Sequence, residues 1–327
     1  MKKVAIIGSG ISGISLAKIL EQKADITLFE KSRGVSGRLS TRRADSYVFD
    51  HGAQYFTIRT DEFRNFLDPL FKFGAVQEWK PRYMRFNKVL DIKSELLEDA
   101  EIRYVGSPNM NSICKYLSEG LNIRLNTKII SMKKGQKWTV FDEHGNEYND
   151  FDWVISTAPS PQTMQIFPKE FKYYESAKSI NMTGAFALML GFNQHLKHRF
   201  DAAHVLNSDI SWIAFNNTKP SRPLDNASIV IHSSEQYFNA NINNELDNII
   251  LNLSQEAEYI IGNDLTSAEY KSLHPWRYAT VATSPKLPPL IDTDLFIASC
   301  GDWCVGGRVE GAFTSAYNTA NKIKELL

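Results

Sequence analysis

The first residues that could do chemistry are three closely spaced glycines followed by an acid. Gly8, Gly10 and Gly13 form a Gly-x-Gly-x-x-Gly pattern, and Glu30 stands seventeen positions after the last of them. Gly8 permits a tight turn, Gly10 lets backbone approach a pyrophosphate, and Gly13 lets a helix lie close to a strand. Glu30 can accept hydrogen bonds from ribose hydroxyls. The pattern predicts a dinucleotide site, because a glycine turn without function would leave Glu30 unexplained.

The elements around these residues are those that such a site requires. Residues 4–7 are an apolar run that predicts a buried strand, residues 14–23 have helical periodicity, and residues 26–29 predict a second strand. Ile11 and Ser12 lie just before this helix and are expected at the cofactor, and the free backbone N–H groups and positive dipole end of its N-terminus would face the phosphates.

A second loop of glycines and cations follows Glu30 without interruption. It runs from Lys31 to Arg38 and contains Gly37. Arginine is a permanent planar cation that suits phosphate oxygens, so we expect Arg38 to contact the pyrophosphate. A plain nicotinamide-binding domain has no need of this second loop, which favours FAD over NAD as the bound dinucleotide.

The stretch that begins at the acid resembles the amine-oxidase-type FAD flavoproteins, and most of all their renalase-like branch. The resemblance is carried by EKSRGVSGRLSTRR at residues 30–43 and FDHGAQYF at residues 49–56. In that family the arginine matching Arg38 meets the FAD pyrophosphate, and the Gly-Ala-Gln-Tyr segment runs beside the isoalloxazine ring. The resemblance therefore implies that Gln54 and Tyr55 lie at the flavin.

A stretch near the other end of the chain resembles the C-terminal FAD motif of the same family. An apolar strand leads into Gly301 and Asp302, and a helix is predicted from about residue 312 to residue 325. Asp302 would accept hydrogen bonds from ribityl hydroxyls. The helix N-terminus would aim N–H groups at flavin N1 and C2=O, where the reduced ring carries negative charge. The contacts implied at this end are Gly301, Asp302, Val309, Glu310 and Ala312.

Other candidate residues carry two interpretations each. Ile129 matches a family position whose backbone neighbours the adenine, but it also suits a packed core. Candidates for the substrate or flavin face are Tyr55, His232, Trp276 and Arg277. In renalase-like sequences the Trp-Arg segment returns towards the flavin, whereas a packed tryptophan and a structural histidine explain the same residues without function. We assign no catalytic acid or base.

The resemblance implies a fold of two parts. The first is an α/β FAD-binding domain of the Rossmann-like amine oxidase and glutathione reductase type, and the second is an α+β substrate domain built on an antiparallel sheet. In the second part, residues 241–261 predict one long helix, and Pro275 would end any helix that reaches it. The expected FAD-binding domain is discontinuous, comprising 1–75, 104–160 and 280–327, and the substrate domain comprises 76–103 and 161–279.

Composition excludes several classes of function. The 327 residues include 37 Lys and Arg and 37 Asp and Glu, so no basic field attracts nucleic acid or anionic lipid. The longest apolar runs are far shorter than the roughly 20 residues of a membrane span. The three cysteines, Cys114, Cys300 and Cys304, have no zinc-binding spacing and are expected to be buried free thiols. We expect a cytoplasmic protein without metal, nucleic acid or membrane partners.

The resemblance also implies an activity. Renalase-like enzymes hold FAD non-covalently and oxidise 2- or 6-dihydro isomers of NAD(P) to NAD(P)+, and O2 then reoxidises the flavin and gives H2O2. A hydride that passes directly to flavin N5 needs no nucleophile or base from the protein. Two alternatives stay open. One is a flavin amine oxidase or desaturase, which would need an aromatic cage and a base or lysine-held water near N5, and the other is a non-catalytic FAD-binding protein.

Overall fold

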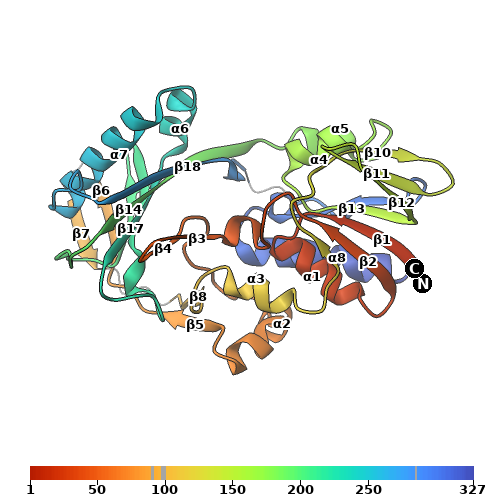
Figure 1. Ribbon diagram of the computed structural model, residues 1–327, viewed down its shortest axis with the longest axis horizontal. Coiled ribbons are helices and arrows are strands. Elements are labelled where there is room, and N and C mark those ends of the chain that lie inside the picture. The colour runs from red at the N-terminus through yellow and green to blue at the C-terminus, as the bar shows by residue number, and fades with distance from the viewer. Residues whose placement is uncertain (90–91, 97–100, 284–285) are drawn as a thin grey trace.

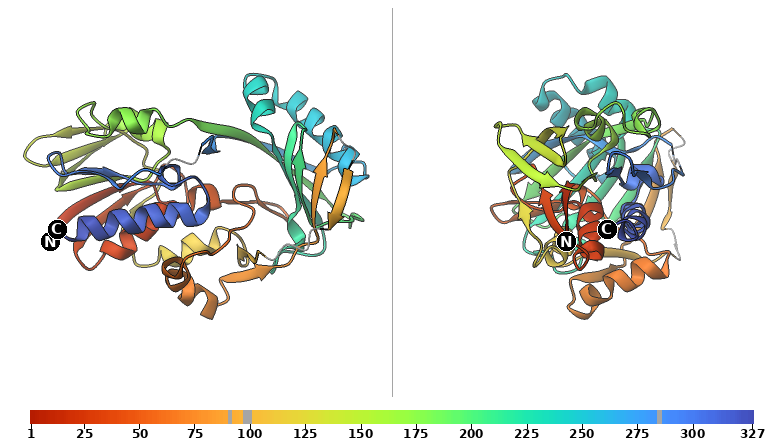
Figure 2. Two further views of the ribbon diagram at one scale, coloured as in Figure 1. Left: turned by 180° about the vertical axis from the view of Figure 1, so that it is seen from behind. Right: turned by 90° about the vertical axis from the view of Figure 1, so that its right-hand side faces the viewer.

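The computed structural model describes residues 1–89, 92–96, 101–283 and 286–327. The chain forms two lobes (Figure 1). The first lobe contains a six-stranded sheet and the second lobe a seven-stranded sheet. The N- and C-termini lie side by side at the far end of the first lobe (Figure 2).

The sheet of the first lobe is parallel except at one edge. In spatial order its strands are β19 (Leu290–Asp292), β20 (Ile297–Ser299), β13 (Trp153–Ser156), β1 (Lys2–Ile7), β2 (Ala24–Phe29) and β9 (Ile123–Arg124). Val4 lies opposite both Ile26 and Trp153, and only β19 runs antiparallel to its neighbour. A parallel sheet is covered on both faces, which explains why its strands are continuous apolar runs. The strands predicted at 4–7 and 26–29 are confirmed.

Alternate residues of β1 face opposite sides of this sheet. Val4 and Ile6 pack against α1 (Ile11–Leu20) and α8 (Val309–Lys324), which contact each other on one face. Ala5 packs on the other face, under a three-stranded antiparallel meander. The elements on that face are β10 (Ile129–Lys134), β11 (Trp138–Asp142), β12 (Glu147–Phe151), α4 (Ser160–Ile166) and α5 (Tyr174–Lys178).

Short elements connect the two main sheets and continue along one side of the molecule (Figure 1). They are β3 (Thr41–Ala44), β4 (Tyr47–Asp50), α2 (Asp61–Lys72), β5 (Val76–Trp79), β8 (Arg103–Gly106) and α3 (Ser112–Leu117). Thr60 accepts a hydrogen bond from the Phe63 backbone N–H and so caps α2. The Phe63 ring packs 5.0 Å from the Phe313 ring of α8, which ties α2 to the first lobe.

The sheet of the second lobe is antiparallel with one exception. In spatial order its strands are β18 (Tyr270–Val281), β14 (Met182–Phe192), β17 (Ala227–Ser233), β16 (Ile210–Phe215), β15 (Ala202–Leu206), β6 (Tyr83–Asn87) and β7 (Ile92–Leu96). The exception is the parallel pair of β15 and β6, because β6 enters from an early part of the chain. The helices α6 (Glu235–Asn241) and α7 (Leu246–Ile261) cover one face, with Ile249 and Leu253 in the shared core. The predicted combination of a Rossmann-like α/β part and an α+β part is confirmed.

Two local expectations are corrected. The helix predicted over 241–261 begins only at Leu246, as α7, because α6 ends at Asn241 and four residues separate the two helices. Asn244 donates its backbone N–H and its side-chain amide to Asn241, and such local bonds favour a turn over a helix. Pro275 ends no helix but lies within β18, where it is tolerated because β18 is an edge strand.

The two main sheets draw on separate parts of the chain. The six-stranded sheet uses strands within 2–29, 123–156 and 290–299, and the seven-stranded sheet uses strands within 83–96, 182–233 and 270–281. Residues 90–91 and 97–100 of the expected substrate domain, and 284–285 of the expected FAD-binding domain, lie outside the described residues. The exact domain boundaries stay a prediction.

The described part of the chain contains neither a candidate membrane span nor a candidate metal-binding cluster. In that part of the chain no helix has the length and apolar character that a bilayer crossing requires. The same residues contain no group of three or more histidine, cysteine or acidic side chains arranged to hold a metal ion.

Candidate functional site

The glycine turn between β1 and α1 leaves no room for a side chain at Gly8 or Gly13. Gly8 has a φ of +103°, which favours glycine, and a Cβ on Gly13 would lie 2.0 Å from the Gly8 carbonyl oxygen. Gly10 is the N-cap of α1 and provides no side-chain hydrogen bond to it. The N–H groups at Ile11 and Ser12 therefore start the helix without a side-chain acceptor, as a phosphate site requires.

Glu30 lies directly beside this turn. Its Oε2 accepts hydrogen bonds from the backbone N–H and the hydroxyl of Ser9, both at 2.9 Å, and Oε1 accepts from the Ser32 backbone N–H at 2.9 Å. The carboxylate is buried, and its hydrogen bonds to Ser9 hold the turn in place. Lys31 is exposed, with Nζ 3.5 Å from Gln162 Oε1, and Ile129 is buried at the start of β10. Contacts of these residues with a cofactor stay a prediction.

Arg38 and Asp302 join the two ends of the expected cofactor site. Arg38 Nη1 donates to Asp302 Oδ2 at 2.9 Å, and Arg38 Nη2 donates to Oδ1 at 2.5 Å. Arg38 Nη1 also donates to the Ala279 carbonyl oxygen at 3.0 Å. Beside them, Gly37 is so close to Gly10 that a Cβ would lie 3.3 Å from the Gly10 Cα. Residues expected at the pyrophosphate and at the ribityl chain are therefore brought together.

At the C-terminal motif the helix N-terminus has no side-chain cap, whereas the Glu310 side chain is already hydrogen-bonded within the protein. The first residues of the motif are held by a bond from the Gly301 N–H to the Ser315 hydroxyl, at 3.1 Å. Helix α8 begins at Val309, and its N-cap, Arg308, has a φ of +71° and forms no side-chain cap bond. The buried Glu310 carboxylate accepts hydrogen bonds from the backbone N–H groups of residues 59 and 60. Only the backbone of Glu310 is left to face a cofactor. Ala312 is buried in the core.

The segment from His51 to Tyr55 is anchored through its backbone. The Ala53 N–H donates to the Arg38 carbonyl oxygen at 2.9 Å, and a Cβ on Gly52 would lie 2.0 Å from that same oxygen. The His51 carbonyl oxygen accepts from Trp276 Nε1 at 2.9 Å and lies 3.1 Å from His232 Nε2. Trp276 and His232, predicted at the substrate or flavin face, thus position this segment.

Aromatic rings and uncharged histidines surround the anchored carbonyl. The His51 ring stacks 5.4 Å from the Trp276 ring and meets the His274 ring edge-on at 5.2 Å. Burial lowers the pKa of His51 to about 3 and that of His232 to about 4, so both rings are neutral near pH 7. A neutral His232 with its proton on Nε2 donates to the His51 carbonyl. Arg277 is exposed on β18 and takes no part in this cluster.

Behind the segment lies a buried charge cluster that sequence reasoning missed. Asp50 Oδ2 accepts from Arg222 Nη2 at 2.6 Å and lies 3.5 Å from Lys219 Nζ, and all three side chains are fully buried. Lys219 Nζ also donates to Gln54 Oε1 at 3.2 Å. Burial alone would raise the pKa of Asp50, but the charges of Lys219 and Arg222 lower it to about 2. Burial lowers the pKa of Lys219 to about 8. Nothing in the sequence marks a lysine more than 160 positions away as a partner of Gln54.

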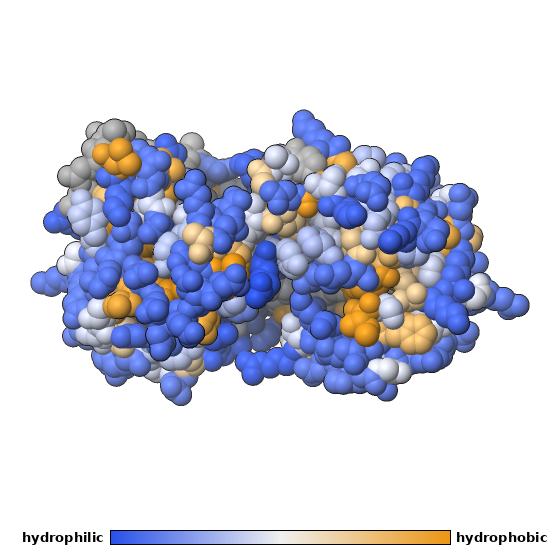
Figure 3. Space-filling view, turned by 90° about the horizontal axis from the view of Figure 1, so that it is seen from above, coloured by the Kyte–Doolittle hydropathy of each residue, from blue (hydrophilic) through white to orange (hydrophobic). Residues whose placement is uncertain are grey.

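Tyr55 belongs to an aromatic group shared by both lobes. Its ring lies 5.7 Å from the Trp212 ring and 6.5 Å from the Trp79 ring. The Arg103 guanidinium lies 5.2 Å from the Tyr55 ring and 4.3 Å from the Tyr83 ring. Seen from above, the molecule is hollowed at the waist between its lobes (Figure 3). Arg103, Trp79 and Trp212 are contacts of Tyr55 that no local sequence pattern indicated.

Comparison with known families matches almost the whole chain. A family model described as "Flavin containing amine oxidoreductase" matches residues 74–324, and one described as "NAD(P)-binding Rossmann-like domain" matches residues 6–70. Among curated relatives, a 4,4'-diapophytoene desaturase (4,4'-diaponeurosporene-forming) of Staphylococcus aureus strain Newman is 39% identical over 51 residues. That match covers 15% of this chain and 10% of the relative, so only a small part of the relative's length is matched.

Solved structures share the fold over the full chain. A protein of Exiguobacterium sp. 255-15, provisionally assigned as a protoporphyrinogen oxidase, has a TM-score of 0.78 and 13% identity, covering 100% of this chain and 99% of its own. A wild-type putrescine oxidase bound to putrescine has a TM-score of 0.71 and 12% identity, covering 98% of each chain. At such low identity these likenesses establish the fold alone.

Proposed function

Because the chain belongs to the family of flavin-containing amine oxidoreductases, we propose that it is an FAD-dependent oxidase of the renalase-like type. Its substrates would be 2- or 6-dihydro isomers of NAD(P). One such molecule, O2 and one proton would give NAD(P)+ and H2O2. The observation that carries the proposal is the Arg38–Asp302 pair, which joins the two expected halves of the cofactor site across 264 positions of sequence.

The residues present fit FAD in shape and in charge. The approach of Gly13 to Gly8 leaves no space for a side chain, and the N-termini of α1 and α8 have no side-chain cap. Arg38 uses three of its five N–H groups on Asp302 and Ala279, which leaves Nε–H and one Nη2–H for phosphate oxygens. These features support a pyrophosphate at α1 and the ring at α8.

We propose that FAD is bound without a covalent bond. Bound FAD would supply the two-electron redox chemistry. Cys304, the thiol nearest the C-terminal motif, is buried, and burial raises its pKa well above its usual range. A buried neutral thiol is a poor nucleophile. All three cysteines are free and buried, which supports the expected cytoplasmic location.

Charge around the anchored segment favours an uncharged ring as substrate over a cationic amine. His51 and His232 are neutral, and the carboxylates of Asp50 and Asp302 are each paired with an arginine. An ammonium group would find these carboxylates already neutralised. A dihydronicotinamide ring needs a flat surface and orientation, and the anchored segment up to Tyr55 would supply one wall of such a site.

The cofactor is tested on the purified protein. We expect yellow protein whose colour is released into the supernatant when the protein is precipitated with acid. Yellow colour that stays on the pellet would contradict non-covalent binding. Colourless protein that also fails to take up added FAD would refute the proposed function as a whole.

The substrate is tested by anaerobic mixing. The flavin absorbance at about 450 nm is followed after addition of 2- and 6-dihydro-NAD(P), ordinary NADH and a panel of amines. Fast bleaching by the isomers alone supports the proposal. Bleaching by no reductant would indicate a non-catalytic FAD-binding protein.

A second candidate, oxidation of an amine, is favoured by one observation. The buried Lys219 contacts Gln54, which is expected at the flavin, so a lysine is present near the place where an amine oxidase would need one. Lys219→Met distinguishes the two candidates, with Lys88→Met as a control, since Lys88 is an exposed lysine of the second lobe paired with Glu256. Dihydro-NAD(P) oxidation should survive Lys219→Met, whereas selective loss of amine oxidation would favour the second candidate.

A further inference from the structure

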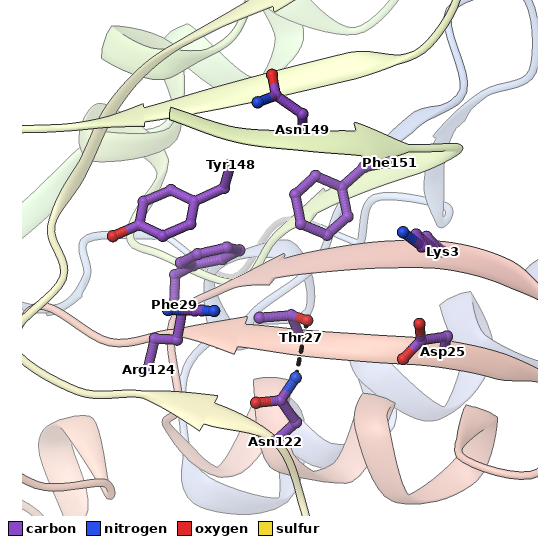
Figure 4. Close-up of a pocket in the computed structure, with 9 residues that line it drawn as sticks. All are labelled: Lys3, Asp25, Thr27, Phe29, Asn122, Arg124, Tyr148, Asn149 and Phe151. Carbon is purple, nitrogen blue, oxygen red and sulfur yellow. Dashed lines mark hydrogen bonds between the residues drawn. The ribbon is translucent and has the colours of Figure 1, made fainter. Parts of the chain in front are cut away.

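A pocket of about 210 Å³ opens on the first lobe between the six-stranded sheet and β12 (Figure 4). Its walls come from β1, β2, β9 and β12. We infer that this pocket is a second ligand site, separate from the cofactor site, that binds a single-ring aromatic carboxylate. The inference stands on the pocket alone and does not depend on the proposed oxidase activity.

The pocket exists because the meander covers only part of the sheet beneath it. Ala5 of β1 is buried under the meander, whereas Lys3, two positions earlier on the same face, is exposed. On β2 the same alternation places Phe29 in the core, Thr27 half-buried and Asp25 exposed. The uncovered margin of the sheet is therefore a polar floor, and β12 overhangs it.

Aromatic rings form the inner wall of the pocket. The Phe29 ring lies 4.9 Å from the Tyr148 ring and 5.9 Å from the Phe151 ring. The Tyr148 hydroxyl donates to Asp142 Oδ2 at 3.0 Å, so this ring is held in place before any ligand arrives. The Phe29 and Phe151 rings are almost fully buried, so the half-buried Tyr148 ring is the surface on which a flat aromatic ring would gain area and favourable ring geometry.

The charges of the pocket favour an anion. The Arg124 guanidinium lies 5.2 Å from the Tyr148 ring centroid, and neither Arg124 nor Lys3 forms an ion pair with any described residue. Asp25 opposes them, so two cations face one acid. Figure 4 shows Arg124 at one end of the pocket and Lys3 with Asp25 at the other. The planar fork of arginine matches a carboxylate, which would therefore point towards Arg124.

Size and position set the remaining limits. The volume is below the about 300–1,000 Å³ of sites for larger ligands, which restricts the occupant to one ring. Lys3 precedes Gly8 by five residues, or about 16 Å along an extended strand. The Lys3 end of the pocket therefore lies towards the opposite end of the strands from the glycine turn. The Arg124 end is nearer to that turn, because the Glu30 backbone N–H donates to the Arg124 carbonyl oxygen at 2.8 Å. Titration in the presence of FAD therefore tests directly whether the two sites are separate.

Benzoate is the probe, added to the full-length protein with and without saturating FAD. Saturation-transfer NMR and calorimetry should show a dissociation constant of about 1 mM or tighter, unaffected by FAD. Arg124→Gln should weaken binding about tenfold or more, because it removes a charge-assisted pair. Tyr148→Phe should keep binding and Tyr148→Leu should abolish it. Lys128→Gln is the control, since Lys128 is an exposed lysine outside the pocket.

Several outcomes would overturn the inference. Benzamide binding as tightly as benzoate would show that charge is not recognised, and benzylamine binding more tightly would assign the recognition to Asp25. Competition by FAD would place benzoate in the cofactor site. Unchanged affinity in both Arg124→Gln and Tyr148→Leu would place it elsewhere. Colourless protein that takes up no added FAD but still binds benzoate would refute the oxidase proposal and leave this one standing.

Discussion

Asp50, Lys219 and Arg222 form a buried cluster with one negative and two positive side chains, so one cation is in excess. Arg222 donates two hydrogen bonds to Asp50 and two more to the carbonyl oxygens of Gly106 and Pro220. Lys219 makes a 3.5 Å contact with Asp50, one hydrogen bond to Gln54, and a cation–π contact with the Trp79 ring, whose centroid is 5.5 Å from Nζ. We therefore expect the two cations to contribute very differently to stability.

The expected magnitudes follow from what each substitution leaves behind. Arg222→Met leaves Asp50 with hydrogen bonds from Thr41 and Met110 but with Lys219, at 3.5 Å, as its one cationic partner among the described residues. It should reduce the free energy of unfolding by about 3–5 kcal/mol, the usual result of breaking a buried pair. Lys219→Met leaves the Asp50–Arg222 pair intact and removes a charge that burial disfavours. Its effect should be about 1 kcal/mol or less.

Thermal unfolding measured by circular dichroism, with and without FAD, separates these cases. At about 2 °C per kcal/mol, Arg222→Met should lower Tm by about 6–10 °C and Lys219→Met by no more than about 2 °C. An equal decrease in Tm in both variants would refute the inference that one cation is in excess. It would show instead that Lys219 stabilises the protein through Asp50. The expected result would instead indicate that the contact of Lys219 with Gln54, and not stability, explains why a lysine stands at this position.

Two further predictions concern the same region. Gly52→Ala should weaken FAD binding at least about tenfold in a fluorescence titration while the circular dichroism spectrum is kept, because the new Cβ would lie 2.0 Å from the Arg38 carbonyl oxygen. The second prediction concerns pH: burial lowers the Lys219 pKa to about 8, against about 10.4 in unfolded chains. Between these values the unfolded state binds more protons, so the urea midpoint of the wild type should rise relative to Lys219→Met across that window, and a parallel pH dependence would contradict the assignment.

Residues close together in sequence were the ones that sequence reasoning could place. The turn from Gly8 to Gly13 and the acid at Glu30 follow local rules of strand, turn and helix, and the structure brings them together. The stretches around Arg38 and Asp302 each resemble an FAD motif of one family, and this resemblance placed both near one ligand, although no local rule could show that they pair directly.

What the sequence could not show are contacts made across the fold. Lys219 lies in an irregular segment rich in proline and cations, where an exposed loop is the ordinary expectation, yet its side chain is fully buried. The role of Trp276 was also out of reach, because its indole bonds a backbone oxygen, which has no signature in the sequence. The break between Asn241 and Leu246 was missed because apolar periodicity continues across it.

The central position of β1 has a consequence for how the protein is made. During synthesis β1 and β2 leave the ribosome early, but β13, the other neighbour of β1, follows about 150 residues later, and β20 later still. An open apolar strand edge is therefore presented to solvent and to other nascent chains until most of the polypeptide has emerged. The sheet of the first lobe is therefore completed only after β20 has emerged, and we expect chaperone dependence to be strongest in this interval.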